Sequence, residues 1–212
     1  MGIKKVYLFD LDGTLVDSMP TGVGIVLGFL REKGIDYPDD IVETLTPLGY
    51  KGVAEYFAKH FSLDYTAEEI FQLFQEKIVR AYGESILLKA HVAEKLKELR
   101  ARGHSLNVLT ASPRALTELC LKRRGVFDLF DNVWSIEDFG MTKADERIYV
   151  EAAKRLRVAV EDCVMVDDNV NVLKAAKRVG MATVGVYEEM TKAAWEEMKR
   201  VADVAVYDFL EI

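Results

Sequence analysis

Two carboxylates follow the first apolar run of the chain at a spacing that suits a bound cation. Val6–Phe9 is rich in strand-forming residues and ends at an acidic turn with the sequence DLDGT, residues 10–14. Gly13 lets the backbone approach a ligand closely. A solvated turn explains one aspartate and the glycine, but it gives no reason for a second acid in the same turn, where carboxylates repel. The pattern therefore predicts a cation as the partner of Asp10 and Asp12.

Polar residues also follow two later apolar runs. Thr110 follows Leu106–Leu109, and Asp167 and Asp168 follow Cys163–Val166. A Ser-Pro pair comes shortly after Thr110, so a helix-capping role explains this threonine equally well. Ligands of parallel sheets bind at the carboxyl ends of the strands. If these runs are strands of one sheet, we expect the polar side chains to gather there.

Short apolar runs alternate with amphipathic helical patterns along most of the chain. We predict buried strands over Val6–Phe9, Leu106–Leu109, Cys163–Val166, Ala182–Val186 and Val204–Val206. We predict helices over His91–Arg102, Pro113–Arg124, Glu146–Arg157, Val172–Val179 and Ala193–Val201. This alternation indicates an α/β fold with a doubly wound, Rossmann-like parallel sheet.

Residues 18–84 break this rhythm, because apolar residues recur there at helical spacing without a convincing strand. We predict helices over Met19–Lys33 and Tyr50–Phe61, and a third from the Thr66 capping box to Tyr82, before Gly83. A crossover between parallel strands needs only one helix. The sequence therefore predicts an all-helical insert over residues 18–84 within an α/β core of residues 1–17 and 85–212.

Four segments resemble the ordered motifs of one enzyme family. DLDGTLVDS, residues 10–18, resembles the first motif of the haloacid dehalogenase-like hydrolases, in the helical-cap branch that includes phosphoglycolate phosphatases and β-phosphoglucomutases. Residues 109–112, 143–149 and 164–171 resemble the next three motifs in the same order. The resemblance covers essentially the whole chain. Two departures are Lys143-Ala144, where the family often has Lys-Pro, and Lys89-Ala90-His91, where many relatives have a Pro-Gly turn.

The resemblance implies a role for each reactive residue. Asp10 would be the nucleophile and Asp12 the general acid and base. Thr110 and Ala111 would bind phosphoryl oxygens. Lys143 would steady both the nucleophile and the transferring phosphoryl group. An unperturbed aspartate titrates near pH ~3.9, so Asp10 would be ionised at neutral pH, whereas Asp12 must hold a proton to act as an acid.

The resemblance also implies a Mg²⁺ site built from oxygen ligands. Asp10, the backbone carbonyl of Asp12 and one or both of Asp167 and Asp168 would bind the ion, because Mg²⁺ prefers such ligands. The sequence leaves the division of labour between Asp167 and Asp168 open.

The implied activity is the hydrolysis of a small phosphorylated metabolite through an aspartyl-phosphate intermediate. A β-phosphoglucomutase-like phosphotransferase shares this chemistry and stays open as an alternative. A haloacid dehalogenase fits less well, because dehalogenation through a carboxylate nucleophile does not require an acid at Asp12. A non-catalytic binding module also fits less well, because Asp10, Asp12, Thr110 and Lys143 are all present.

Composition narrows the expected partners and location. A formal charge of -7 and a pI near 5.1 argue against nucleic acid as the main partner. The longest apolar stretch, Val23–Leu30, is far shorter than the roughly 20 residues that cross a bilayer. Cys120 and Cys163 lie far apart without metal-ligand spacing, which fits a reducing cytoplasm. We expect a cytoplasmic monomer or homodimer without membrane contact.

One further candidate residue lies in the predicted insert. Lys51 belongs to PLGYKG, residues 47–52, a glycine-flanked turn between two helical patterns. Related caps use such a turn to read the substrate, so Lys51 could meet an anionic or hydroxyl group while Tyr50 lies against a leaving group. A solvated lysine at a helix start explains the pattern equally well.

Overall fold

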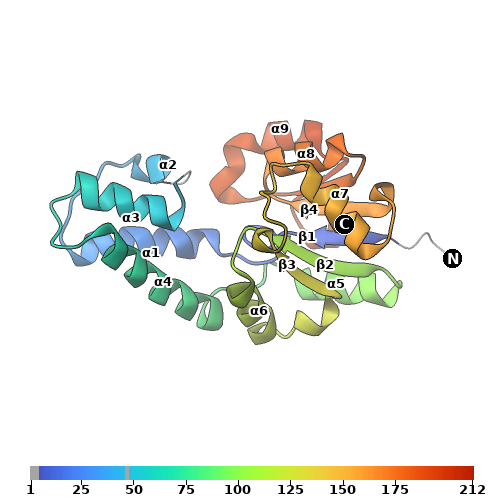
Figure 1. Ribbon diagram of the computed structural model, residues 1–212, viewed down its shortest axis with the longest axis horizontal. Coiled ribbons are helices and arrows are strands. Elements are labelled where there is room, and N and C mark those ends of the chain that lie inside the picture. Colours follow the sequence, from blue (N-terminus) through green and yellow to red (C-terminus); the bar gives the residue numbers. More distant parts are fainter. Residues whose placement is uncertain (1–4, 46–47) are drawn as a thin grey trace. The chain divides into compact units, whose positions relative to one another are not determined.

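Six parallel strands form the central sheet of the chain, in the order β3-β2-β1-β4-β5-β6. Figure 1 labels β1, β2, β3 and β4. The computed structural model describes residues 5–45 and 48–212. The strands are β1 Val6–Phe9, β2 Ser105–Thr110, β3 Asn132–Ser135, β4 Cys163–Asp167, β5 Ala182–Val186 and β6 Val204–Val206. The chain divides into a sheet unit, which ends its first segment at Ser18 and resumes at Ile86, and a helical unit, Met19–Ser85.

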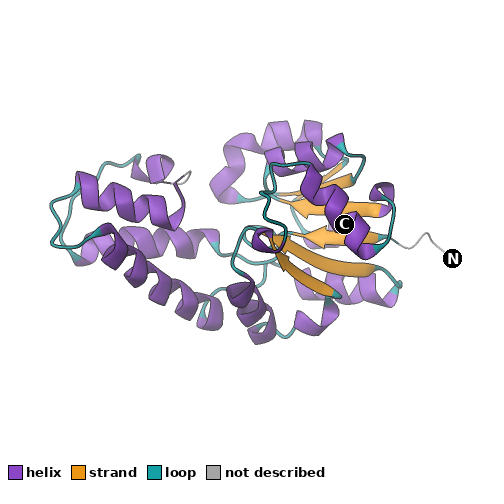
Figure 2. Ribbon diagram, viewed as in Figure 1, coloured by secondary structure: helices purple, strands orange, loops and turns teal. Residues whose placement is uncertain are grey.

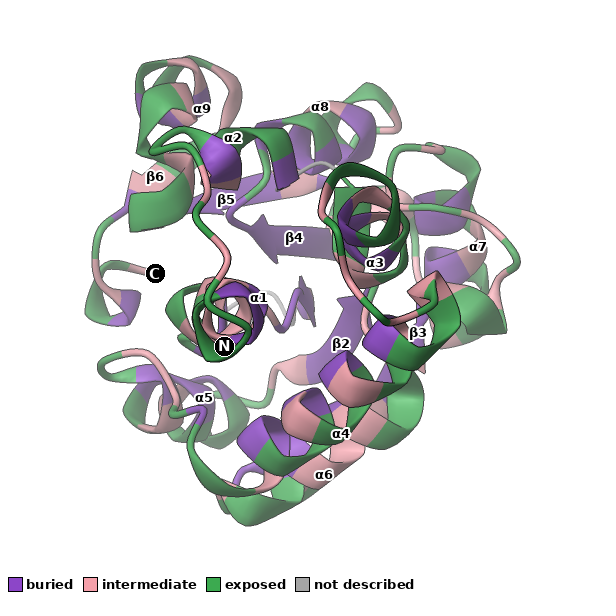
Figure 3. Cartoon of the chain, turned by 90° about the vertical axis from the view of Figure 1, so that its left-hand side faces the viewer, coloured by how far each residue is buried: buried purple, intermediate pink, exposed green. Residues whose placement is uncertain are grey.

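Strand β1 lies in the middle of the sheet, between β2 and β4. Phe9, its last residue, pairs with Val108 on one side and Val166 on the other. The strands β2, β4 and β5 carry mainly buried residues, as their colour in Figure 3 shows. Asp10 therefore leaves the sheet where both neighbouring strands are about to end.

Helices cover both faces of this sheet. They are α5 Val92–Ala101, α6 Arg114–Arg123, α7 Arg147–Leu156, α8 Val170–Arg178 and α9 Trp195–Val201. Side chains of α7, α8 and α9 share one apolar cluster with β1 and β4, in which Tyr149, Leu173 and Met198 are buried. From β1 to β3 the chain adds strands toward one edge of the sheet, and from β4 to β6 it adds them toward the other edge. Because the crossovers are right-handed, α5 and α6 lie on the face opposite to α7, α8 and α9 (Figure 1). Short 3-10 helices lie at Phe127–Leu129, Ile136–Asp138, Val160–Asp162, Glu189–Ala194 and Phe209–Glu211.

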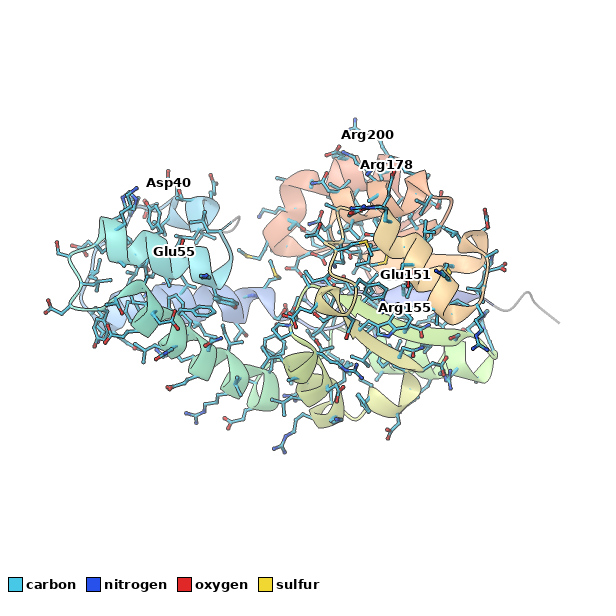
Figure 4. The ribbon with its side chains drawn as sticks, in the orientation of Figure 1. Asp40, Glu55, Glu151, Arg155, Arg178 and Arg200 are labelled. Carbon is cyan, nitrogen blue, oxygen red and sulfur yellow. The ribbon has the colours of Figure 1, made fainter. Side chains whose placement is uncertain are left out.

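The outer face of α7 is mainly polar, as its amphipathic pattern predicts. Glu151 and Arg155, labelled in Figure 4, form an ion pair of 3.2 Å one helical turn apart. The Arg155 guanidinium also lies 4.0 Å from the ring centroid of Phe139. Exposed pairs of this kind add little stability, so α7 is held chiefly by its buried face.

The described residues of the helical unit form helices and loops (Figure 2), and these helices enclose an apolar core of their own. Its helices are α1 Met19–Glu32, α2 Ile41–Leu45, α3 Gly49–His60 and α4 Ala67–Glu84. Phe29, Phe57 and Phe74 are buried, and their ring centroids lie 5.6–6.1 Å apart. The predicted capping box is present, because Thr66 accepts from the backbone N–H of Glu69 and the Glu69 carboxylate accepts from the Thr66 N–H.

The predicted fold class is confirmed, and the differences concern single elements. The prediction lacked β3, a short strand at the edge of the sheet, and the short helix α2. Helix α4 continues through Gly83 to Glu84, where the sequence predicted an end before the glycine. Helix α3 begins at Gly49. Lys51 therefore lies in the first turn of the helix predicted over Tyr50–Phe61, which agrees with the alternative of a lysine at a helix start. Residue 47 of the expected turn lies outside the described residues.

Candidate active site

Acidic and hydroxyl side chains converge at the carboxyl ends of the three central strands. Asp10 directly follows β1, Thr110 is the last residue of β2, and Asp167 ends β4. All three are buried, although they are polar. Buried polar groups of this kind need charged or hydrogen-bonding partners, and these partners define the site.

Lys143 joins two of these carboxylates. Its Nζ atom lies 2.8 Å from Oδ1 of Asp10 and 2.8 Å from Oδ2 of Asp167. Burial alone would lower the pKa of Lys143, but the carboxylates of Asp10 and Asp167 outweigh burial and raise it. The lysine is therefore charged at neutral pH. The hydroxyl of Tyr149 donates to the Lys143 carbonyl at 2.6 Å, which holds the backbone of the lysine in place.

Asp10, Asp167 and Asp168 form a cluster of carboxylates in which one oxygen of each lies within 4.8 Å of the others. Burial raises the pKa of Asp167 to about 6 against the opposing effect of Lys143. Burial and the two neighbouring carboxylates raise the pKa of Asp168 well above its ordinary value. Three carboxylates share a single ammonium, so the site carries an excess of negative charge that a cation would relieve.

The hydrogen bonds distinguish Asp167 from Asp168. Both oxygens of Asp167 have donors, because Oδ2 accepts from Lys143 and Oδ1 accepts from the backbone N–H of Asn169, each at 2.8 Å. Oδ1 of Asp168 accepts from the Thr14 hydroxyl at 2.9 Å. Within the described residues, Oδ2 of Asp168 accepts no hydrogen bond, so it is the oxygen better placed to bind an ion.

Gly13 and Thr14 position Asp168, and sequence reasoning gave neither of them this role. Gly13 has a φ of +75°, and a Cβ at this position would lie 2.7 Å from Oδ2 of Asp168. A side chain at Gly13 would thus both strain the backbone and push into the carboxylate. Sequence alone could not find the Thr14–Asp168 contact, because the two residues are distant in the chain and meet only in the folded sheet.

Two serine hydroxyls hold Asp12. Ser18 donates to its Oδ1 at 2.6 Å, and Ser112 donates to its Oδ2 through a short hydrogen bond. Asp12 is half-buried, whereas Asp10 is buried. Sequence reasoning assigned a role to neither serine, although both lie in the segments that resemble family motifs.

Thr110 lies where the sequence places it, at the end of β2. Its Oγ1 accepts a hydrogen bond of 3.1 Å from the backbone N–H of Ser112. The hydroxyl proton stays available, because a hydroxyl can donate while it accepts. The next residue, Ala111, is exposed. The end of β2 therefore presents the Thr110 hydroxyl next to an exposed residue.

Lys51 belongs to the other of the two units, Met19–Ser85. Lys51 is an exposed residue of α3 in the helical unit. The ring of its neighbour Tyr50 packs against Phe74 with centroids 6.3 Å apart. The Tyr50 hydroxyl lies 2.7 Å from the position of a Cβ on Gly22, so Tyr50 packs within the helical unit.

Other potential sites find little support. Within residues 5–45 and 48–212, the cluster around Asp10 is the only group of His, Cys, Asp and Glu side chains close enough to hold a metal ion. Cys120 and Cys163 are free, and burial raises the pKa of each thiol to about 11. Among the described helices, none combines the length and the apolar character that a membrane span requires.

Comparisons with known proteins agree with this geometry. The family model of the haloacid dehalogenase-like hydrolases matches residues 4–180. Validoxylamine A 7'-phosphate phosphatase of Streptomyces hygroscopicus subsp. limoneus is 29% identical over 213 residues, which cover 98% of this chain and 95% of that protein. A phosphoglycolate phosphatase of Xanthomonas campestris pv. campestris (strain 8004) is 30% identical, with 87% and 83% covered.

A solved structure shows the same fold. CbbY from Rhodobacter sphaeroides in complex with phosphate matches with a TM-score of 0.75 at 25% identity, over 98% of this chain and 96% of that chain. Residues 4–180, which the family model matches, contain Asp10, Asp12, Thr110, Lys143, Asp167 and Asp168. The chain therefore belongs to the haloacid dehalogenase-like hydrolases, and relatives along almost its full length are named phosphatases.

Proposed function

We propose that this enzyme is a Mg²⁺-dependent phosphatase that hydrolyses a small phosphorylated metabolite through an aspartyl-phosphate on Asp10. The observation that carries the proposal is the ammonium of Lys143, which lies 2.8 Å from a carboxylate oxygen of both Asp10 and Asp167. A fixed positive charge beside a carboxylate nucleophile offsets the repulsion between that nucleophile and a phosphate dianion. The phosphatase names of the two relatives support the same chemistry.

Two half-reactions follow from the positions of Asp10 and Asp12. In the first, a carboxylate oxygen of Asp10 attacks phosphorus, the bond from phosphorus to the leaving oxygen breaks, and Asp12 donates a proton to that oxygen. In the second, Asp12 takes a proton from water, which attacks the phosphorus and releases inorganic phosphate and the Asp10 carboxylate. Ser18 and Ser112 can hold Asp12 in either protonation state, because a hydroxyl both donates and accepts.

Thr110 and Lys143 stabilise the transferring phosphoryl group in this mechanism. The Thr110 hydroxyl accepts from the Ser112 N–H and so keeps its own proton for a phosphoryl oxygen. Lys143 has one further N–H donor beside Asp10, because its contacts with Asp10 and Asp167 use two of its three. Donors that are already fixed before the reaction cost little reorganisation as charge develops. Ala111, exposed beside Thr110, is proposed to contribute its backbone N–H.

The donor set of the site fits Mg²⁺. Oδ1 of Asp10 is a buried acceptor whose only close partner among the described residues is the Lys143 ammonium. We propose that Asp10, the backbone carbonyl of Asp12 and Asp168 hold the ion, while Asp167 chiefly holds Lys143. When bound, Mg²⁺ neutralises charge on the phosphoryl oxygens and the carboxylates around them.

Single substitutions separate the roles of Asp167 and Asp168. In Asp168→Asn, we expect the Mg²⁺ concentration for half-maximal rate to rise roughly tenfold or more, because a ligand oxygen is lost. In Asp167→Asn, we expect a smaller rise and a lower kcat at saturating Mg²⁺, because Lys143 loses an anionic partner. Rates of phosphate release measured across a Mg²⁺ titration report both quantities. The reverse order of the two Mg²⁺ requirements would assign Asp167 as the closer ligand.

We propose that the helical unit is the cap that selects the substrate, and that Lys51 at the start of α3 contributes to selection. Lys51→Ala is then expected to lower kcat/KM for the best natural substrate roughly tenfold, because a contact to its variable part is lost. Hydrolysis of p-nitrophenyl phosphate should change little, since this substrate offers few groups to bind. Lys59→Ala, at an exposed lysine of the same helix, is the matched control. Equal effects of Lys51→Ala on both substrates would defeat the proposal.

The substrate class is proposed from the two relatives, whose names both denote phosphatases of small phosphorylated molecules. Purified enzyme with Mg²⁺ should release phosphate from p-nitrophenyl phosphate, and a panel of phosphorylated metabolites should rank the natural substrates. A phosphotransferase would instead move the phosphoryl group between hydroxyls of a sugar without net phosphate release. Measuring phosphate together with sugar phosphate products distinguishes the two activities.

A further inference from the structure

Lys89 lies in the sheet unit, close to Ile86, where this unit resumes after the helical unit. The segment around Lys89 pairs with residues 15–17 of the same unit through two backbone hydrogen bonds. The Asp17 N–H donates to the Leu87 carbonyl at 2.9 Å, and the Lys89 N–H donates to the Leu15 carbonyl at 3.0 Å. The backbone of Lys89 is therefore fixed directly beside the loop that follows β1.

The ammonium of Lys89 has three acceptors within the sheet unit. It donates to the carbonyls of Gly13 and Tyr187 and to Oε2 of Glu188, each at 2.8 Å. An ammonium has three N–H groups, so these contacts use its full donor capacity. The Glu188 side chain is only 3% exposed. Lys89 is the charged partner of Glu188, whose Oε1 accepts from the backbone N–H of Met190 at 3.3 Å. Removing one partner of a buried ion pair is strongly unfavourable.

Gly13, which accepts a hydrogen bond from Lys89, is a direct neighbour in the chain of the proposed catalytic residue Asp12. Gly13 lies between Asp12, the proposed acid and base, and Thr14, whose hydroxyl donates to Asp168 at 2.9 Å. The Gly13 N–H donates to the Val16 carbonyl at 3.0 Å. The carbonyl of the same residue accepts from Lys89. Both the backbone N–H and the carbonyl of Gly13 are therefore hydrogen-bonded. The partner of the N–H lies nearby in the chain, whereas the partner of the carbonyl is Lys89.

We propose that Lys89 is a positioning residue, which ties the loop of residues 10–14 to the segment after β5 and so keeps Asp12 in its working orientation. The effect on turnover rests on the proposed phosphatase function. The effect on loop mobility does not. The alternative is that Lys89 and Glu188 form an ion pair that only stabilises the fold, and a pair of substitutions separates the two.

The experiment compares three variants of the full chain. Lys89→Met removes the ammonium and leaves Glu188 buried without its partner. Glu188→Gln removes the carboxylate but leaves the contact from Lys89 to Gly13. The double variant, Lys89→Met with Glu188→Gln, lacks the ammonium but no longer buries an unpaired charge. Thermal unfolding, kcat and KM for p-nitrophenyl phosphate, and hydrogen–deuterium exchange of the amides in residues 13–16 are measured for each.

The positioning role predicts that stability and turnover respond differently. Tm should fall in Lys89→Met and recover substantially in the double variant, because the unpaired charge is gone. We expect kcat to stay reduced on the order of tenfold to a hundredfold in both, with KM little changed, because the proposed acid is misplaced in each. Exchange of the Gly13 and Val16 amides should be faster in both. Glu188→Gln should retain near wild-type kcat and amide protection.

Recovery of kcat and of amide protection in the double variant would overturn the proposal, since both would then follow stability alone. Unchanged exchange in Lys89→Met would overturn it as well. If the loop exchanges faster in the two Lys89 variants while the wild-type enzyme releases no phosphate from any substrate, the proposed phosphatase function fails and the positioning of the loop stands.

Discussion

Replacing Asp10 by asparagine is expected to abolish turnover, with kcat lowered by at least about 10³-fold, because an amide cannot serve as the nucleophile. Asp10 directly follows the central strand β1 and lies 2.8 Å from the Lys143 ammonium. Asparagine has nearly the same shape, so the variant removes the charge without opening a cavity. Phosphate release at saturating Mg²⁺ and substrate measures the loss.

The stability of the Asp10→Asn variant should not fall with its activity. Lys143 keeps Asp167 as its partner, and the repulsion that Asp10 exerts on Asp167 and Asp168 disappears. We therefore expect a Tm equal to or above that of the wild type in metal-free buffer. Asp64→Asn, at an exposed acid of the helical unit, is the control and should leave kcat unchanged. Wild-type turnover in Asp10→Asn would rule out the aspartyl-phosphate mechanism.

The sheet could be predicted because its central strands are buried on both faces. Val6–Phe9 and Cys163–Val166 read as continuous apolar runs, which are typical of strands at the centre of a parallel sheet. Strand β3 is different, because it lies at the sheet edge and Asn132 and Ser135 make its two ends polar. Strand β3 forms because it pairs with β2 in the folded sheet. Its own sequence indicates a strand only weakly.

The sequence predicted residues of the site one strand end at a time, but it did not predict the contacts between residues that are distant in the chain. Asp10, Thr110 and Asp167 come at the ends of three separate apolar runs, and folding brings Asp10 and Asp167 together with Lys143, which follows no such run. The contacts that hold those residues link distant positions through side chains. Thr14 meets Asp168, and Lys89 meets Gly13, only once the strands are in register. No local pattern in a single sequence encodes such pairs.

The Asp12→Asn variant is expected to separate the two half-reactions. p-Nitrophenolate leaves readily without protonation, so Asp10 should still be phosphorylated by p-nitrophenyl phosphate. Hydrolysis of the aspartyl-phosphate lacks its base, and steady-state turnover should fall by about 10²- to 10⁴-fold. A burst of close to one equivalent of p-nitrophenolate per enzyme should therefore precede a slow phase. An alkyl phosphate, whose leaving oxygen needs a proton, should give no burst.

Rapid-mixing measurements of both substrates at saturating Mg²⁺ test this difference. Ser18 and Ser112 each donate to one oxygen of Asp12. In the variant, the serine that meets the amide nitrogen can accept instead, because a hydroxyl proton rotates. The side chain should thus keep its place, and the kinetic change should report the lost proton transfer. A slow rate with no burst on p-nitrophenyl phosphate would place the defect in the attack by Asp10. Steady-state turnover near the wild-type rate would show that Asp12 acts only structurally, since neither half-reaction would then depend on its proton.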